Sequence, residues 1–470
     1  MTQCTQASFG FEAHFRREVV ARFDGGQITS DAGALLLRKT EQRTGILRQF
    51  TSCFTDHRRS GKVEHKLPEL LRQRVYGLVL GYEDLNDHDQ LRADPLLAVM
   101  AGKRDVEGSE RRRKRDRGKP GAGKSTLNRL ELTPKEADHT ARYKKIVMDE
   151  SAVDRLLVDL YIQAQEKMPE QVVLDLDATD DPIHGEQEGR FFHGYYGAYC
   201  YLPLYVFAGE HLVCARLRPS NLEASAGSVE EVERIVGQLR RVWPEVKIIL
   251  RADSGFCREA LMQWCEEHAV EYVFGLARNQ KLERIIGGEL QQAAQEWEQT
   301  KKPARVFREF FYRTRKSWSR ERRVVAKAEH LDKGRNPRFI VTSLSAEWME
   351  GRKLYEEFYC GRGEMENRIK EQQLALFADR TSTALLRSNQ LRLYFSSIAY
   401  CLMQALRRLG LRGTEMAKAQ CQTIRLKLLK IGARLRVTAR KVWVSMSSAY
   451  PYAGVFGQAF RNLEEAALRC

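Results

Sequence analysis

Two aspartates lie near the ends of apolar, β-branched runs of the 470-residue chain. Asp177 is in "QVVLDLDATDD", and Asp253 is in "VKIILRADSGF". Short runs of this kind predict central strands, and carboxylates at strand ends in one sheet can converge. Converged carboxylates are the hard oxygen ligands that Mg²⁺ and Mn²⁺ prefer. Two such ions can activate a water and stabilise the leaving oxygen of a phosphodiester, so this chemistry is indicated if a third carboxylate completes the site.

The best third carboxylate is in the segment "EEFYCGRGEMENRIKEQQ". Tyr359, Arg362, Glu366 and Lys370 follow one another at spacings of three, four and four residues, so on a helix they form one stripe. A phenol, a guanidinium, a carboxylate and an ammonium are an unusual mixture for a core face. The alternative is a solvated face with an ordinary pair of Glu and Lys four residues apart.

The segment "GKPGAGKST", Gly118 to Thr126, matches the phosphate-binding pattern G-x-x-x-x-G-K-[ST]. Such a loop requires a buried strand before it, and the preceding "SERRRKRDRG" is a charge run that cannot be one. No apolar strand with a terminal carboxylate follows shortly afterwards. We therefore interpret the segment as a basic, glycine-rich linker that leads into a helix, and we expect no dependence on a nucleotide.

A zinc site and a disulfide framework are not indicated. The ten cysteines are scattered without a C-x-x-C pair, and the spacing of His184 and His193 fits no common zinc-binding motif. The start of the chain lacks the pattern of a signal peptide, and no run approaches the roughly 18 apolar residues of a spanning helix. We expect a cytosolic protein with reduced cysteines.

The charge of the chain indicates a polyanionic partner. The formal net charge is +16, and the excess is concentrated in Lys103–Arg129 and Cys401–Ser445. Nucleic acid is the simplest partner for such a balance, and solubilising surface charge is the alternative. The C-terminal "TIRLKLLKIGARLRVTARKVWVSM" combines basic residues with an apolar stripe. It either packs on the core or contacts DNA directly.

The patterning predicts an α/β protein with a mixed sheet flanked by helices. A helix from about Pro134 to Met168 precedes the first strand, three adjacent strands are followed by alternating strand and helix, and a long helix begins at Gly351 and ends near Phe377. The expected divisions are a helical N-terminal DNA-binding region (1–102), a basic linker (103–129), the first part of the core (130–277), a β-rich insertion (278–350), the second part of the core with the helix that carries the stripe (351–400) and a basic, helical C-terminal region (401–470).

These motifs together resemble the DDE transposases of bacterial insertion sequences. The resemblance consists of Asp-x-Thr at the end of a first strand, Asp after a fourth strand, and Tyr-x-x-Arg-x-x-x-Glu on a helix beyond a β-rich insertion. The phrases "FDGGQITSDAGALLLR", "DATDDPIHGEQEGRFFHGYYG", "KSTLNRLEL" and "LLKIGARLRVTARKVWV" are similar to the insertion-sequence family numbered thirteen-eighty, over nearly the whole chain. The resemblance implies a ribonuclease H-like core.

Carried over to this chain, the resemblance makes Asp177, Asp253 and Glu366 the metal-binding catalytic triad. Asp175, Asp180 and Asp181 compete with Asp177, which is preferred because Thr179 follows two residues later.

The resemblance also assigns DNA contacts. Tyr359 and Arg362 would hold DNA phosphates near the scissile bond. The related enzymes have a lysine seven residues after the glutamate, where this chain has Gln373, and Lys370 is a possible substitute. Trp318, among basic residues in the insertion, either stacks on an unpaired base or anchors a β-hairpin.

The function implied is metal-dependent, cut-and-paste DNA transposition with Mg²⁺, which Mn²⁺ can replace, and without a nucleotide. The implied partners are the terminal inverted repeats of the protein's own element and target DNA, bound by a homodimer. The expected location is the bacterial cytoplasm, at the nucleoid when DNA is bound. A catalytically inactive, basic DNA-binding protein derived from a transposase is the alternative.

Overall fold

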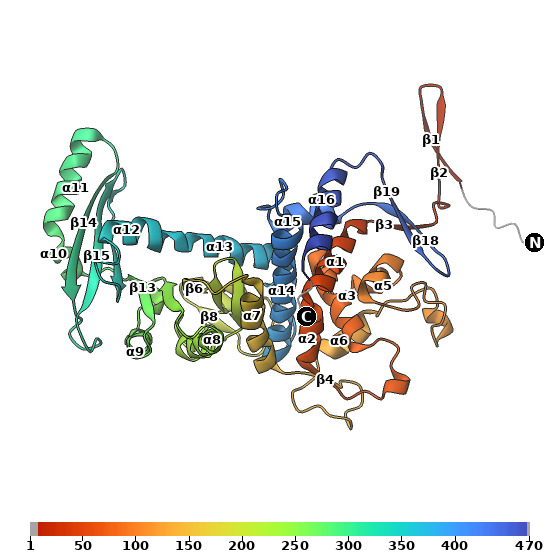
Figure 1. Cartoon of the computed structure of the whole chain (residues 1–470), viewed down its shortest axis with the longest axis horizontal. Helices are drawn as coiled ribbons and strands as arrows, with labels where there is room; N and C mark the ends of the chain where they lie inside the picture. Colours follow the sequence, from red (N-terminus) through yellow and green to blue (C-terminus); the bar gives the residue numbers. More distant parts are fainter. Residues whose placement is uncertain (1–7, 468–470) are drawn as a thin grey trace, which may run out of the picture. The chain divides into compact units, whose positions relative to one another are not determined.

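The computed structural model describes residues 8–467 and divides the chain into two compact units (Figure 1). The first unit contains the N-terminal part up to Asp149, Ala375–Phe377, and the chain from Ile398 onward. The second unit contains Glu150–Leu374 and Ala378–Ser397. Within residues 8–467, no helix combines the length and the apolar character needed to cross a membrane.

A mixed nine-stranded sheet forms the centre of the second unit. The strand order is β11-β10-β6-β12-β13-β17-β15-β14, with the short β16 paired to β15. β6, β12 and β13 run parallel to one another, and every other pairing in this sheet is antiparallel. The strands are β6 (Gln171–Ala178), β10 (Leu204–Ala208), β11 (His211–Arg216), β12 (Lys247–Ala252), β13 (Glu271–Leu276), β14 (Ala304–Tyr312), β15 (Arg322–Leu331), β16 (Gly334–Arg335) and β17 (Arg338–Thr342).

The two faces of β6 have different neighbours because successive side chains of a strand point to opposite faces. Val172, Leu174 and Leu176 are buried in the main core with apolar residues of α7 (Glu150–Ala164), α8 (Ser228–Val242) and α9 (Glu259–Glu267). Asp175 and Asp177 alternate with them and therefore point to the other face. The carboxylates of β6 thus lie on the side of the sheet away from these helices.

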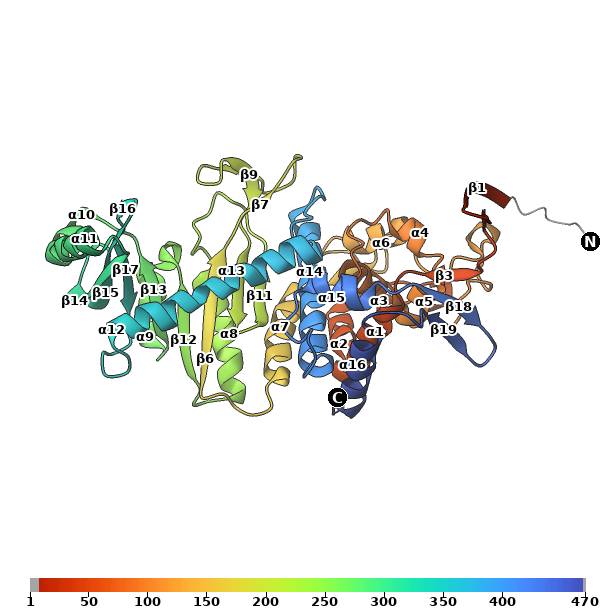
Figure 2. The ribbon, with the colours of Figure 1, turned by 90° about the horizontal axis from the view of Figure 1, so that it is seen from above.

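A long, irregular helix crosses this other face (Figures 1 and 2). It runs through α12 (Gly351–Lys353), a π-helical segment η5 (Leu354–Tyr359), a 3₁₀ turn η6 (Cys360–Arg362), α13 (Gly363–Lys370) and a second π-helical segment η7 (Glu371–Ala375). Leu354 and Tyr355 pack in a second core cluster with Ile249 of β12 and Val273 of β13. π-helical segments are rare and occur frequently at functional sites.

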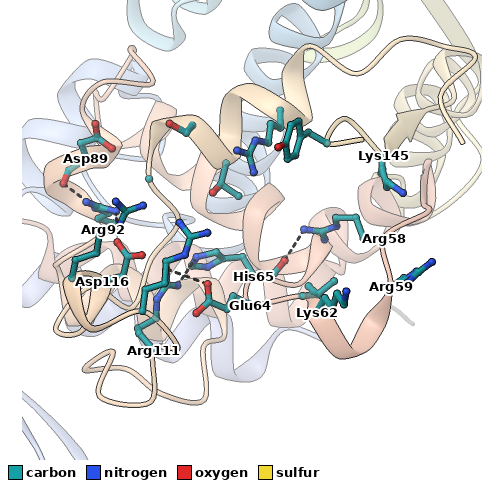
Figure 3. A pocket seen from close by; sticks show the side chains of 18 of the residues that line it. Arg58, Arg59, Lys62, Glu64, His65, Asp89, Arg92, Arg111, Asp116 and Lys145 are labelled. Carbon is teal, nitrogen blue, oxygen red and sulfur yellow. Dashed lines mark hydrogen bonds and ion pairs between the residues drawn. The ribbon is translucent and has the colours of Figure 1, made fainter. Parts of the chain in front are cut away.

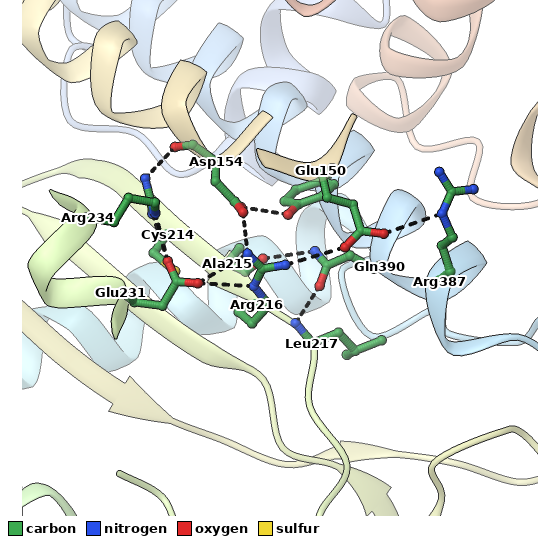
Figure 4. A network of polar contacts seen from close by, with 11 residues as sticks. Glu150, Asp154, Cys214, Ala215, Arg216, Leu217, Glu231, Arg234, Arg387 and Gln390 are labelled. Atoms are coloured by element: carbon green, nitrogen blue, oxygen red, sulfur yellow. Dashed lines mark hydrogen bonds and ion pairs between the residues drawn. The ribbon is translucent and has the colours of Figure 1, made fainter. Parts of the chain in front are cut away.

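A buried network of charges joins α7, β11, α8 and α14 (Leu386–Ala405) (Figure 4). Asp154, which is 1% exposed, pairs with Arg216 and accepts a hydrogen bond of 2.6 Å from the hydroxyl of Tyr394. Glu231 lies 3.2 Å from Arg216 and 2.9 Å from Arg234. Burial raises the pKa of Asp154, and the cationic neighbours oppose that shift. The network satisfies charges that would otherwise be costly inside the unit.

The first unit is mainly helical, but the N-terminal and C-terminal regions, both expected to be helical, also contain strands, among them the antiparallel pair β1 (Ser8–His14) and β2 (Arg17–Arg22). The C-terminal part returns to the N-terminal part, because β18 (Ala433–Val437) pairs with β3 (Gln27–Thr29) and with β19 (Val442–Met446). Arg425 donates a 2.6 Å hydrogen bond to the carbonyl of Val79, which ends α3 (Leu67–Val79). The remaining helices of eight or more residues are α1 (Leu35–Thr44), α6 (Lys124–Glu131) and α16 (Ala453–Glu465).

The apolar stripe of the C-terminal segment is buried, with Leu428, Leu429 and Ile431 each at most 1% exposed. Core packing therefore accounts for these three residues.

The helix expected from about Pro134 to Met168 is wrong over its first half. The structure contains helix only over Glu150–Ala164, preceded by the strand β5 (Ile146–Met148). Asp138 accepts hydrogen bonds from the backbone N–H and the hydroxyl of Thr140, at 2.7 and 2.6 Å. Such local side-chain bonds favour a turn over a helix.

The β-rich segment within 278–350 continues the main sheet, because β17 pairs antiparallel with β13. The antiparallel strands expected here are confirmed. The segment also contains two helices that the sequence reading did not identify, α10 (Gln280–Ile285) and α11 (Gly287–Thr300).

Candidate active site

The four aspartates that competed for the first site position have different surroundings. Asp175, which is 1% exposed, is held by Arg251, whose Nε and Nη2 lie 2.5 and 2.8 Å from its two carboxylate oxygens. The register of the parallel pair β6 and β12 places these two residues opposite each other. Asp181 is also 1% exposed, and burial raises its pKa well above the usual value.

Asp177 lies two residues closer to the end of the strand than Asp175, on the same face. Its Oδ2 is 3.6 Å from Nη1 of Arg362. Nη2 of the same guanidinium is 3.6 Å from Oε1 of Glu366, one turn further along the helix. One guanidinium therefore spans a carboxylate of the sheet and a carboxylate of the crossing helix.

Asp253 directly follows β12, at the same end of the sheet as Asp177. The register pairs Ala252 with Leu176, so Asp253 and Asp177 are the next residues of two adjacent parallel strands. Oδ1 of Asp253 caps a 3₁₀ turn by accepting a 2.8 Å hydrogen bond from the N–H of Gly255. This bond fixes the carboxylate at the end of the strand.

Tyr359 lies against Gly275 of β13. A Cβ atom built on Gly275 would be 2.6 Å from the Tyr359 hydroxyl and 2.8 Å from the backbone nitrogen of Ser254. Gly361, two residues after Tyr359, would in the same way place a Cβ 2.9 Å from Nη1 of Arg251. The helix thus crosses β13, β12 and β6 in succession, and two glycines permit the close approach (Figure 2).

The electrostatics of this cluster favour a cation. Burial is the main cause that raises the pKa of Asp177 to about 6; Arg362 opposes the shift, and the carboxylates of Asp253 and Glu366 add to it. Burial disfavours the charge of Arg362, but the surrounding carboxylates nevertheless raise its pKa. Burial also raises the pKa of Tyr359. Positive charge therefore stabilises the ionised carboxylates here.

The chemistry of these residues fits a divalent metal ion, because carboxylate oxygens are the ligands that Mg²⁺ and Mn²⁺ prefer. Among residues 8–467, no three His, Cys, Asp or Glu side chains are close enough together to bind one ion in the present arrangement. Arg362 lies between two of the carboxylates. The side chain of Glu366 is 50% exposed, so there is room for it to change rotamer.

Gln373 stands where the related enzymes have a lysine, Lys370 is its expected substitute, and the two side chains have different surroundings. Lys370, at the end of α13, is exposed. Gln373 donates a 3.1 Å hydrogen bond from its amide to the carbonyl of Asp180, just beyond β6. Gln373 therefore contacts the loop that follows Asp177.

Trp318 is 6% exposed and lies between β14 and β15. Its ring packs edge-on against Tyr312, with centroids 5.7 Å apart, and the guanidinium of Arg322 lies 5.4 Å from its centroid. This burial favours hairpin anchoring, which is one of the two alternatives left open by the sequence.

The sequence reading missed two features of the site. The first is the pair of Asp175 and Arg251, which only the strand register brings together. The second is Tyr196, whose pKa is raised to about 12, mainly by burial and also by the carboxylates of Asp180 and Asp177. Tyr196 lies between β8 (Phe191–His193) and β9 (Ala198–Tyr201), where the aromatic run from Phe191 to Tyr201 is the signal that would have drawn attention to it.

Comparison with known proteins identifies a family for this chain. A family model described as transposase DDE domain group 1 matches residues 11–468, nearly the whole chain. A search of curated proteins finds no match.

Proposed function

The chain belongs to the transposase DDE domain family, group 1, and we propose that it catalyses metal-dependent, cut-and-paste transposition of DNA. In the proposed reaction, water hydrolyses a phosphodiester at the end of a mobile element and frees a 3′-hydroxyl. That hydroxyl then attacks a phosphodiester of the target DNA and displaces a target oxygen. No nucleotide and no covalent intermediate with the protein are needed.

The observation that carries the proposal is that Arg362 lies 3.6 Å from a carboxylate of the central strand, Asp177, and 3.6 Å from a carboxylate of the crossing helix, Glu366. Asp177 and Asp253 occupy matching positions at the same end of two adjacent parallel strands, and Glu366 comes from the helix that crosses these strands. In this proposal the three carboxylates hold the metal ions. Bound divalent ions would supply an activated water and neutralise the charge that develops on the phosphate.

The other residues of the cluster orient DNA. The planar guanidinium of Arg362 suits a phosphate, which it would bind through two parallel hydrogen bonds once it leaves the carboxylates. Tyr359 would donate its hydroxyl to a neighbouring phosphate, because burial keeps it protonated. Lys370 would contact DNA further along the helix.

We further propose that the core is ribonuclease H-like and that the chain belongs to the insertion-sequence family numbered thirteen-eighty. The order of the first five core strands supports the fold: β6 is the first and β12 the fourth along the chain, and both lie at the centre of the sheet. Residues 130–277 and 351–400 would form the core, and 278–350 its insertion.

Regions 1–102 and 401–470 would bind the element's terminal repeats, joined to the core by the segment 103–129. A homodimer would hold two ends, in the bacterial cytoplasm.

The decisive experiment uses the purified full chain with a labelled duplex that carries its own element end, and Mg²⁺ without nucleotide. Glu366→Gln is the matched variant, since it removes the charge and keeps the shape. We expect cleavage at the element end by the wild type alone. Binding by both proteins with cleavage by neither, even in Mn²⁺, would favour the inactive DNA-binding protein.

A further inference from the structure

The first unit contains a strongly basic cavity of about 820 Å³ (Figure 3). Ten Arg and Lys side chains line it, against three carboxylates from Glu64, Asp89 and Asp116. The residues come from the segment after β4 (Phe54–Asp56), from α4 (His88–Leu91) and the residue after it, from the expected linker around α6, and from the loop before β5. Arg92 and Arg111 lie on one side of the hollow, and Arg58 and Arg59 on the other (Figure 3).

Much of this charge is not compensated within the protein. Arg92 pairs with Asp116 at 3.5 Å, and Arg111 pairs with Glu64 at 3.7 Å. By contrast, the exposed side chains of Arg59, Arg113 and Arg115 form no ion pair within residues 8–467. A concave surface that gathers unpaired cations has a strong positive potential.

His65, at the wall of the basic cavity, is surrounded by several cations. It is 5% exposed, and Nη1 of Arg111 lies 2.5 Å from its Nε2. Burial and the charges of Lys103, Arg111, Arg58 and Arg92 lower its pKa to about 2. Its Nδ1 and the Nε of Arg111 are both buried without a hydrogen-bond partner in the described part of the chain. The positive charge of the basic cavity therefore extends into its wall.

The phosphate-binding pattern of the sequence lies beside the basic cavity, but not as a nucleotide loop. Gly123, Ser125 and Thr126 line the cavity, and α6 begins at Lys124. Between residues 103 and 123 the structure has only a 3₁₀ turn at Lys114–Asp116 and no strand. The ammonium of Lys124 contacts Asn86 at 3.1 Å and Asp89 at 3.6 Å, so the lysine of the pattern already has partners within the protein.

The lining offers little apolar surface for a base. Val63 and Tyr143 supply its main apolar surface. The ring of Tyr143 already contacts the guanidinium groups of Arg129 and Arg142, at 4.8 and 4.9 Å from its centroid. A ligand that offers several phosphates without inserting a base fits better than a mononucleotide.

We propose that the basic cavity binds backbone phosphates of duplex DNA. This inference rests on the proposed function for its ligand, because a transposase must hold DNA, but it assigns a site in the first unit, formed by residues other than the catalytic candidates. The contacts are to phosphate and carry no sequence information. The site therefore contributes affinity, while recognition of the element end requires other residues.

The test is DNA binding by the full chain without metal, with a fluorescent duplex of random sequence. The variant replaces Arg59, Arg113 and Arg115 together by Ala, and a second variant replaces all three by Lys. A matched control replaces Arg155, Lys167 and Arg241, three exposed cations of the second unit, by Ala. Thermal unfolding is followed for each protein so that loss of folding is recognised.

We expect the alanine variant of the basic cavity to bind about tenfold more weakly or worse. We also expect the slope of log affinity against log salt, between about 50 and about 200 mM, to be less steep by about 3. The lysine variant should retain most of the affinity, and the control variant should bind like the wild type.

Unchanged binding by the folded alanine variant would overturn the proposal, as would an equal loss in the control. Displacement of DNA by micromolar ATP would also overturn it in favour of a nucleotide site. Cleavage of an element end is measured separately. Binding through the basic cavity without any cleavage would contradict the proposed reaction and leave this inference intact.

Discussion

Nη1 of Arg362 lies 3.6 Å from Oδ2 of Asp177, so a helix residue supplies positive charge to the carboxylate of the central strand. The same side chain reaches Glu366 at 3.6 Å. Arg362 therefore has two possible partners in the proposed reaction, the carboxylates before DNA binds and a phosphate afterwards. This exchange makes Arg362 the most informative residue to alter.

Arg362→Ala should raise the pKa of Asp177 above its value of about 6, because the guanidinium lowers that pKa. It should also slow cleavage by about 10²- to 10³-fold, as expected when a donor that stabilises developing charge is removed. The cleavage rate of Arg362→Lys should lie between those of the wild type and Arg362→Ala, since lysine keeps the charge but not the paired donors. NMR titration of the Asp177 carboxyl and cleavage rates at saturating DNA test this. An unchanged pKa would contradict the assigned contact.

Asp177→Asn should stabilise the metal-free protein above about pH 6. The folded pKa of about 6 exceeds the ordinary 3.8, so the folded state binds the proton more tightly, and stability falls as pH rises from about 4 through 6. The variant does not lose stability in this way. Its free energy of unfolding at pH 8 should therefore exceed that of the wild type by about 1–3 kcal/mol. Urea unfolding at pH 4 and pH 8 measures the effect, which should be absent at the lower pH. Saturating Mg²⁺ should stabilise the wild type more than the variant.

Asp175→Asn should have the opposite effect, although it makes the same chemical change two residues away. It breaks a buried pair with two hydrogen bonds and leaves Arg251 without its carboxylate partner. Burial raises the pKa of Asp175 as well, but the loss of the pair with Arg251 outweighs the relief from burying a carboxylate. We expect the free energy of unfolding to fall by about 3 kcal/mol or more. Denaturant unfolding beside Asp177→Asn provides the comparison. Equal stabilities of the two variants would contradict the assignment of a stabilising pair with Arg251 to Asp175 alone.

Gly275→Ala should displace the crossing helix, because its Cβ would lie 2.6 Å from the Tyr359 hydroxyl. We expect a loss of about 1–3 kcal/mol in stability and slower cleavage. The loss should be smaller in a Tyr359→Phe background, so a double-mutant cycle tests the contact. Gly237→Ala in α8 is the control, since its Cβ would meet nothing within 4 Å. Additive effects of Gly275→Ala and Tyr359→Phe would argue against the contact.

The sequence by itself was sufficient for features that depend on local patterns. The strands that carry Asp177 and precede Asp253 are apolar runs, and the helices α8 and α9 follow ordinary helical periodicity, so each was expected in its place. The absence of a strand before "GKPGAGKST" could also be predicted from the local sequence, because a run of charged residues cannot form a buried strand. The stripe of Tyr359, Arg362 and Glu366 could be read from spacing, although the π-helical segment η5 that precedes Arg362 could not.

Only the tertiary structure decided which aspartate has which surroundings. Asp175 and Asp177 are alike in the sequence, and they differ because strand register places Arg251 beside the first while the crossing helix places Arg362 beside the second. The burial of Trp318 and the basic cavity are also long-range results, since they require segments distant in sequence to pack together. Local propensity specifies strands and helices, but register and packing specify which charges meet.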